Sequence, residues 1–133
     1  MMRERSIRKT GLVLAACALP YVAVADNGRL TGEDIREAVV GRTVYLAAPL
    51  GGEFPLNYRP SGVVDGNGTA LGLGKFIQPT DKGKWWIAGD RLCQQFKVWY
   101  KGSKMCFTLQ SAGPNRVKWV RDNGETGVAR ISD

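Results

Sequence analysis

The chain has 133 residues, a formal net charge of +7 and no histidine. The absence of histidine excludes a histidine-based catalytic triad, an imidazole metal ligand and the most common general base of enzymes. Hydrophobic residues make up 44% of the sequence, which is enough for one core of modest size. The composition therefore favours one small globular domain.

The first 25 residues have the pattern of an export signal. Four basic residues lie between positions 3 and 9, residues 11–18 are apolar, and Ala23-Val24-Ala25 forms a small-x-small cleavage site before Asp26. We expect residues 1–25 to be removed as a signal peptide and residues 26–133 to form a single exported domain in the periplasm. Because residues 1–25 contain four of the 19 basic and one of the 12 acidic residues, the domain carries only +4, and we expect no nucleic-acid partner.

A second interpretation of the same segment is a lipoprotein signal. Leu14-Ala15-Ala16-Cys17 matches the pattern at which bacterial lipoproteins are cut and lipidated on the cysteine. Few apolar residues precede Cys17, and the apolar run continues to Val22, which favours simple cleavage after Ala25. We expect contact with a membrane only if Cys17 is lipidated, because the run is shorter than the ~20 residues that span a bilayer.

A short helix is predicted after Leu30. Thr31 suits the N-cap, acidic residues follow in the first turn, and Gly41 suits the end of the helix. One side of the helix would carry three apolar residues: Ile35, Ala38 and Val39. We expect this side to cover one end of the remaining fold.

From residue 42 onward, short β-rich runs alternate with turn signals such as Gly51-Gly52, Asp65-Gly66 and Asn123-Gly124. Three of the runs are Thr43–Leu46, Lys84–Ile87 and Arg116–Val120. This pattern predicts a mainly β fold, an antiparallel meander closing into a small barrel with one short N-terminal helix.

Two cysteines, Cys93 and Cys106, remain after the predicted signal peptide, and an even pair in an oxidising compartment indicates a disulfide. In both surrounding segments the cysteine alternates with apolar residues, so it lies on the polar face of its strand. If the strands pair around a loop over residues 97–102, Cys93 lies opposite Cys106. A reactive redox pair is the alternative, and the absence of C-x-x-C spacing disfavours it.

Glycine, tryptophan and cysteine recur in a fixed order along the domain, in the stretches Leu30–Ile35, Gly41–Val44, Asp65-Gly66, Gly83–Cys93 and Cys106-Phe107. This order resembles a group of small exported proteins of Gram-negative bacteria with no assigned activity. The resemblance implies a fold and a compartment, and it carries over no catalytic residue. The second tryptophan, Trp86 beside Trp85, departs from the pattern.

Patterns for catalysis and metal binding are sparse. Two cysteines and scattered carboxylates do not make a zinc site, and we expect neither a metal nor a cofactor. A pair of carboxylates for glycoside hydrolysis would have to come from four residues: Glu53, Asp65, Asp81 and Asp90. Three of them lie in turn sequences, where a short acid more often caps the backbone. An enzyme is therefore the least favoured class.

The candidate binding surface is a loop with two large aromatic residues and three lysines: Trp99, Tyr100, Lys97, Lys101 and Lys104. Aromatic faces beside cations suit sugar rings, anionic head groups or a protein partner. Alternatively, Trp99 or Tyr100 folds back over the barrel mouth while the lysines are solvated. Adjacent residues of a strand face opposite sides, and we expect Trp86, on the face of Lys84, to extend the exposed surface.

The leading hypothesis is a non-catalytic periplasmic module that binds an envelope protein or an anionic or sugar ligand. A second hypothesis is a small barrel that holds an apolar ligand inside. A lipidated envelope protein anchored at Cys17 and an enzyme are the remaining alternatives.

Overall fold

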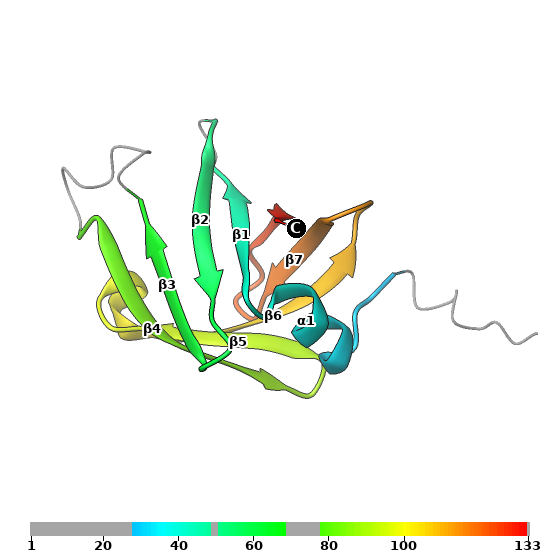
Figure 1. The fold of residues 1–133 in the computed structure, drawn as a ribbon, viewed down its shortest axis with the longest axis horizontal. Coiled ribbons are helices and arrows are strands. Elements are labelled where there is room, and N and C mark those ends of the chain that lie inside the picture. Colours follow the sequence, from blue (N-terminus) through cyan, green and yellow to red (C-terminus); the bar gives the residue numbers. More distant parts are fainter. Residues whose placement is uncertain (1–27, 49–50, 69–77, 133) are drawn as a thin grey trace, which may run out of the picture.

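The computed structural model describes residues 28–48, 51–68 and 78–132. Within them, a short helix precedes eight antiparallel strands, and β1 pairs with β8 so that the sheet closes on itself (Figure 1). The predicted meander closed into a small barrel is therefore confirmed. The elements are α1 (Gly32–Val39), β1 (Arg42–Ala47), β2 (Glu53–Tyr58), β3 (Val63–Asn67), β4 (Thr80–Ala88), β5 (Arg91–Phe96), the 3₁₀ helix η5 (Trp99–Gly102), β6 (Lys104–Ser111), β7 (Arg116–Arg121) and β8 (Thr126–Ile131).

Helix α1 begins where the sequence predicts because its first turn satisfies its own backbone donors. The Thr31 hydroxyl accepts a hydrogen bond from Asp34 N (3.2 Å), and the Asp34 carboxylate accepts one from Thr31 N (3.0 Å), which completes a capping box. Asp90, in the turn after β4, accepts a hydrogen bond from Gly32 N at 2.8 Å. Ile35 and Val39 are buried in the core. The helix is thereby fixed to one end of the barrel.

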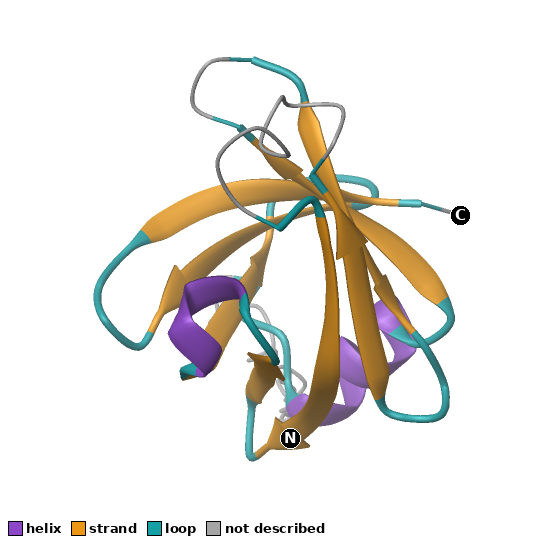
Figure 2. Cartoon of the chain, turned by 90° about the vertical axis from the view of Figure 1, so that its left-hand side faces the viewer, coloured by secondary structure: helices purple, strands orange, loops and turns teal. Residues whose placement is uncertain are grey.

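The two helical segments lie at opposite ends of the barrel (Figure 2). Gly41 N, just after α1, donates to Tyr58 O at one end of β2. The ring of Phe54, at the other end of β2, packs against Trp99 of η5 with 5.1 Å between ring centres. Helix α1 therefore covers one end of the barrel, as predicted, and η5 covers part of the other.

Side chains alternate between the inside and the outside of the barrel along each strand. On β5, Leu92, Gln94 and Phe96 are buried on the inside. On β4, Trp85 is buried while its neighbour Trp86 is partly exposed on the outside. The inward apolar side chains form one core together with those of α1.

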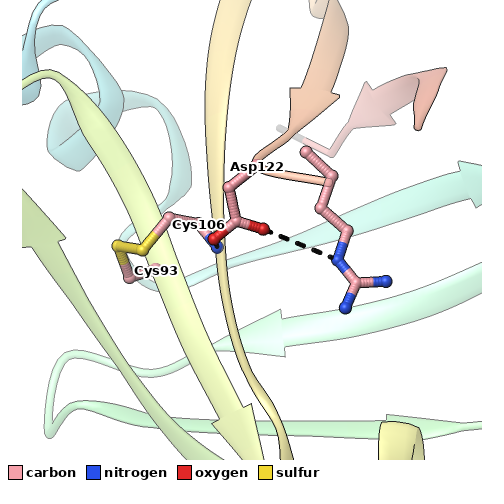
Figure 3. Close-up of a disulfide and its surroundings, with 4 residues drawn as sticks. Cys93, Cys106 and Asp122 are labelled. Atoms are coloured by element: carbon pink, nitrogen blue, oxygen red, sulfur yellow. Dashed lines mark hydrogen bonds and ion pairs between the residues drawn. A yellow bond between two sulfur atoms is a disulfide. The ribbon is translucent and has the colours of Figure 1, made fainter. Parts of the chain in front are cut away.

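The hairpin of β5 and β6 carries the disulfide. Cys93 lies opposite Cys106 in the strand register and is bonded to it (Figure 3), which confirms the predicted pairing. Asp122, after β7, forms two hydrogen bonds with Cys106: its backbone N donates to Cys106 O (2.8 Å), and its carboxylate accepts from Cys106 N (3.3 Å). The hairpin that carries η5 is thus braced on both sides.

Replacement of both cysteines, Cys93→Ala with Cys106→Ala, should lower the free energy of unfolding by about 3 kcal/mol, because a bridge over a separation of 13 residues no longer restricts the unfolded chain. Urea unfolding followed by tryptophan fluorescence measures this change. The reduced wild type should unfold at the same urea concentration as the variant. A variant as stable as the oxidised wild type would contradict the bracing role.

Candidate functional site

The interior of the barrel contains a cavity of about 80 Å³. Its wall is built mainly from apolar side chains, among them Val44, Leu56, Met105, Leu109, Val117 and Ala129. A volume of about 10–15 Å³ on the same measure holds one water molecule, so the space is large enough for a small molecule. The wall also includes Val39 of α1 and Tyr100 of η5, which places the cavity between the two covered ends.

The Trp99 side chain fills the end of the barrel that η5 covers. It is only 6% exposed, and its ring lies 5.1 Å from the ring centres of Phe54 and Phe96. Its indole N–H donates to Gln78 O at 2.7 Å. Gly66 on β3 makes room for the ring, because a Cβ there would lie 2.8 Å from Trp99 Cζ3. Of the two interpretations that the sequence offers, Trp99 therefore follows the one in which it folds back over the barrel mouth, and it is not part of an exposed binding surface.

A buried carboxylate fixes the start of η5. Asp81 is 8% exposed, and its Oδ2 accepts hydrogen bonds from Val98 N (2.7 Å) and Trp99 N (2.8 Å). Burial alone would raise the pKa of Asp81, but the N–H groups of Trp99, Val98 and Lys82 outweigh it and hold this pKa below its usual value. The sequence predicts a backbone cap for this type of acid, but the capped segment lies 17 residues away, beyond the reach of a local pattern.

The two residues after Trp99 have an uncommon backbone. Tyr100 and Lys101 have φ angles of 56° and 58°, in the left-handed region that side chains disfavour. The Asp81 contacts hold the chain just before these two residues. The Gln95 side-chain amide holds the chain just after them, because it donates to Gly102 O at 2.9 Å. Tyr100 consequently lies at the edge of the barrel, where it is 47% exposed and lines the cavity.

Tyr100 and Glu125 are the two exposed residues among those that line the cavity, and together with the half-buried Arg121 we call them the rim. The Arg121 guanidinium lies 5.7 Å from the centre of the Tyr100 ring, and its Nη1 pairs with Glu125 Oε1 at 3.1 Å. Hydrogen bonds from Asn123 and from Arg121 lower the pKa of Glu125, so its carboxylate is negatively charged at neutral pH. The entrance to an apolar cavity is thus bordered by an aromatic ring and an ion pair.

A neutral polar pair lies deeper in the wall. The Tyr58 hydroxyl donates to Gln94 Oε1 at 2.6 Å, and both residues line the cavity. Burial raises the pKa of Tyr58 far above its usual value, so the hydroxyl keeps its proton. Among the described lining residues, only Arg121 and Glu125 are of a charged residue type. Two more lining residues have a buried nitrogen without a hydrogen-bond partner among the described residues, Trp119 (Nε1) and Arg121 (Nε). The interior therefore offers mainly apolar contact together with a few polar atoms.

Four exposed lysines lie together on the outside of β4, β5 and β6. Lys84 is opposite Gln95, and Gln95 is opposite Lys104. Lys97 N donates to Lys82 O at 3.1 Å, so these two residues form the next row. We call the four lysines the basic face (Lys82, Lys84, Lys97 and Lys104). Sequence analysis identified Lys97 and Lys104 as candidates but missed Lys82 and Lys84, which strand alternation places beside them only once the register is known.

The other predicted surface residues border the basic face. Trp86 is on the same outer surface, opposite Cys93, and Lys84 Nζ lies 5.9 Å from the centre of its ring. Lys101 is exposed in η5 next to Tyr100. The structure thus gathers the predicted residues other than Trp99 on one outer surface and the adjoining loop.

The four carboxylates considered for catalysis have separate structural partners. Glu53 pairs with Arg130, Asp65 with Arg59, Asp81 with the backbone of η5, and Asp90 with the backbone of α1. Within residues 28–48, 51–68 and 78–132, no three Cys, Asp or Glu side chains gather closely enough to hold a metal ion.

In the same part of the chain, no helix has the length and apolar character needed to cross a membrane. Cys17, Ala25 and Asp26 lie outside the described residues, so the signal-peptide and lipidation hypotheses stay predictions.

These features define a small antiparallel β-barrel, braced by a disulfide and hollow at its centre. No protein-family model matches the sequence, and neither a curated protein nor a solved structure was found to match it. The resemblance to small exported Gram-negative proteins stays a prediction.

Asp81→Asn should destabilise the protein by about 1–3 kcal/mol at neutral pH, because the two backbone donors lose a charged acceptor. The pKa of Asp81 is lower in the folded protein than the ~3.9 of an unfolded chain. Its contribution is therefore complete above pH ~4 and is lost as the pH falls through the folded pKa. Urea unfolding from pH 7 down to acid should show a shallower decline for the variant.

The matched control is Asp90→Asn, which removes the charge of an exposed carboxylate that accepts from one backbone N–H. We expect a smaller loss of stability for this variant. Wild-type stability and acid dependence in Asp81→Asn would show that Asp81 does not anchor η5.

Proposed function

We propose that the protein is an exported, non-catalytic binding protein that holds a small apolar molecule, or the apolar end of one, inside its barrel. The observation that carries this proposal is the apolar cavity of about 80 Å³ within a closed eight-stranded barrel. Barrels of this size have an interior that side chains fill or that holds one small ligand.

The shape of the interior supports a binding role. Protein cores are usually packed so closely that voids larger than a water molecule are few. Here the small side chain of Ala129, opposite Val117 on β7 and Leu46 on β1, borders the space. An apolar cavity is a poor site for water and a good one for an apolar guest. The chemical class that fits is a short alkyl chain or a small ring.

The rim supports entry from one side. Of the residues that line the cavity, Tyr100 and Glu125 are exposed and Arg121 pairs with Glu125, so a polar end of the ligand would remain beside these residues. The loop predicted as a binding surface thus contributes to this site through Tyr100. The disulfide agrees with an oxidising compartment, such as the periplasm, and with the predicted signal peptide.

Ala129→Leu should abolish binding of small apolar probes, because the larger side chain occupies the space that Ala129 borders. Xenon and pentane are suitable probes, detected through the methyl NMR signals of Leu56 and Met105 and through thermal unfolding. At ten times its Kd, a probe should stabilise the wild type by about 1.4 kcal/mol. The variant should gain nothing.

The matched control is Val128→Leu, which enlarges the exposed neighbour on the outer face of β8 and should bind like the wild type. Ala129→Val makes a smaller change and serves if the leucine overpacks the core. Equal responses of the wild type and the Ala129 variants, or no response in any of them, would refute an interior site.

A further inference from the structure

The basic face concentrates positive charge that the cavity does not use. Strands lie about 4.8 Å apart, so the backbones of Lys84 and Lys104, on either side of Gln95, are about 10 Å apart. Lys82 and Lys97 extend the same surface by one row towards η5. Four lysines thus cover three adjoining strands.

Nearby acids neutralise this charge only in part, through longer-range attraction between Asp65 and Lys82 and between Asp81 and Lys97. Asp65, opposite Lys82 on β3, is held by Arg59 at 2.6 Å and by Asn57 at 2.9 Å. Asp81 turns inward to the backbone of η5. Among the described residues, none of the four lysines forms an ion pair. The basic face is therefore open to an anionic partner.

Exposed apolar side chains border the basic face. Val98, directly after Lys97, is 52% exposed, and Tyr100 is 47% exposed. We call the segment of residues 97–101 the η5 tip; it has a lysine at each end and three apolar or aromatic residues between them. A hydrophilic acidic polymer would use the charges but would leave Val98 in water. A lipid surface uses both, because cations are attracted to anionic head groups while apolar and aromatic side chains enter the interface.

We infer that the basic face and the η5 tip form a docking surface for membranes rich in anionic phospholipid. The lysines bind the head groups, and Val98 and Tyr100 enter the interfacial layer. This contact requires no lipid on Cys17, and the inference does not rest on the proposed function. It places the rim of the cavity next to the bilayer, because Tyr100 belongs to both the rim and the tip.

Cosedimentation with lipid vesicles tests the inference, using purified protein whose N-terminus is established by intact mass. The vesicles consist of phosphatidylcholine alone or with one third phosphatidylglycerol. We expect binding to the anionic vesicles only, and weaker binding as salt screens the charges. Lys84→Gln with Lys97→Gln should weaken binding roughly 25-fold, about fivefold for each lysine. Val98→Ser alone should also weaken binding to the anionic vesicles, without changing the salt dependence of that binding.

The matched control, Arg116→Gln with Lys118→Gln, removes the same charge from exposed positions on β7 and should bind like the wild type. Equal weakening by this control would show a general charge effect and overturn the docking surface. Vesicle binding by Val98→Ser as strong as that of the wild type would also overturn it. Binding to a soluble polyuronate without binding to the vesicles would overturn it as well, and would identify an acidic glycan as the partner. Circular dichroism confirms that each variant is folded.

Discussion

The hydrogen bonds from Val98 N and Trp99 N to the buried Asp81 carboxylate anchor η5 at one end of the barrel. They position Trp99 inside the barrel, where its ring fills the space above Gly66. With Trp99 held inside, the chain continues through two left-handed residues and places Tyr100 at the rim. The Asp81 carboxylate thus determines both the buried position of Trp99 and the position of Tyr100 at the rim, because both residues follow the point where it holds the loop.

The strands make this arrangement rigid. The hairpin that carries η5 is crosslinked by the disulfide and bonded through Cys106 to Asp122. On its other side, Gly83 of β4 lies so close to β5 that a Cβ would collide with Gln95 O. The same Gln95 holds Gly102 at the end of η5. Because the barrel is closed, these contacts cannot relax through a free sheet edge, and the strain of a left-handed Tyr100 can persist.

The sequence predicts those features of the fold that depend on residues close together in the chain. The capping box at Thr31, the phase of Cys93 and Cys106, and the alternation of the strands are local signals, and the structure confirms the elements that they predict. Burial of Trp99 depends on a glycine across the barrel and on an acid 18 residues away, so local pattern leaves both of its interpretations open. No sequence pattern predicts the cavity either, because its size depends on which side chains meet across the interior of the barrel. The basic face needs the strand register, which alternation alone does not give.

The size of the cavity connects the two proposals. A guest with about five heavy atoms gains at most roughly 1.5 kcal/mol per atom, which limits its binding free energy to about −7.5 kcal/mol and its Kd to roughly 3 μM. Such a site is occupied only where its ligand is abundant. Small apolar molecules concentrate in bilayers because burial of their surface away from water is favourable. On the proposed function, a barrel whose rim lies against an anionic membrane would meet its ligand where the ligand is most concentrated. The basic face would thereby compensate for weak binding in the cavity.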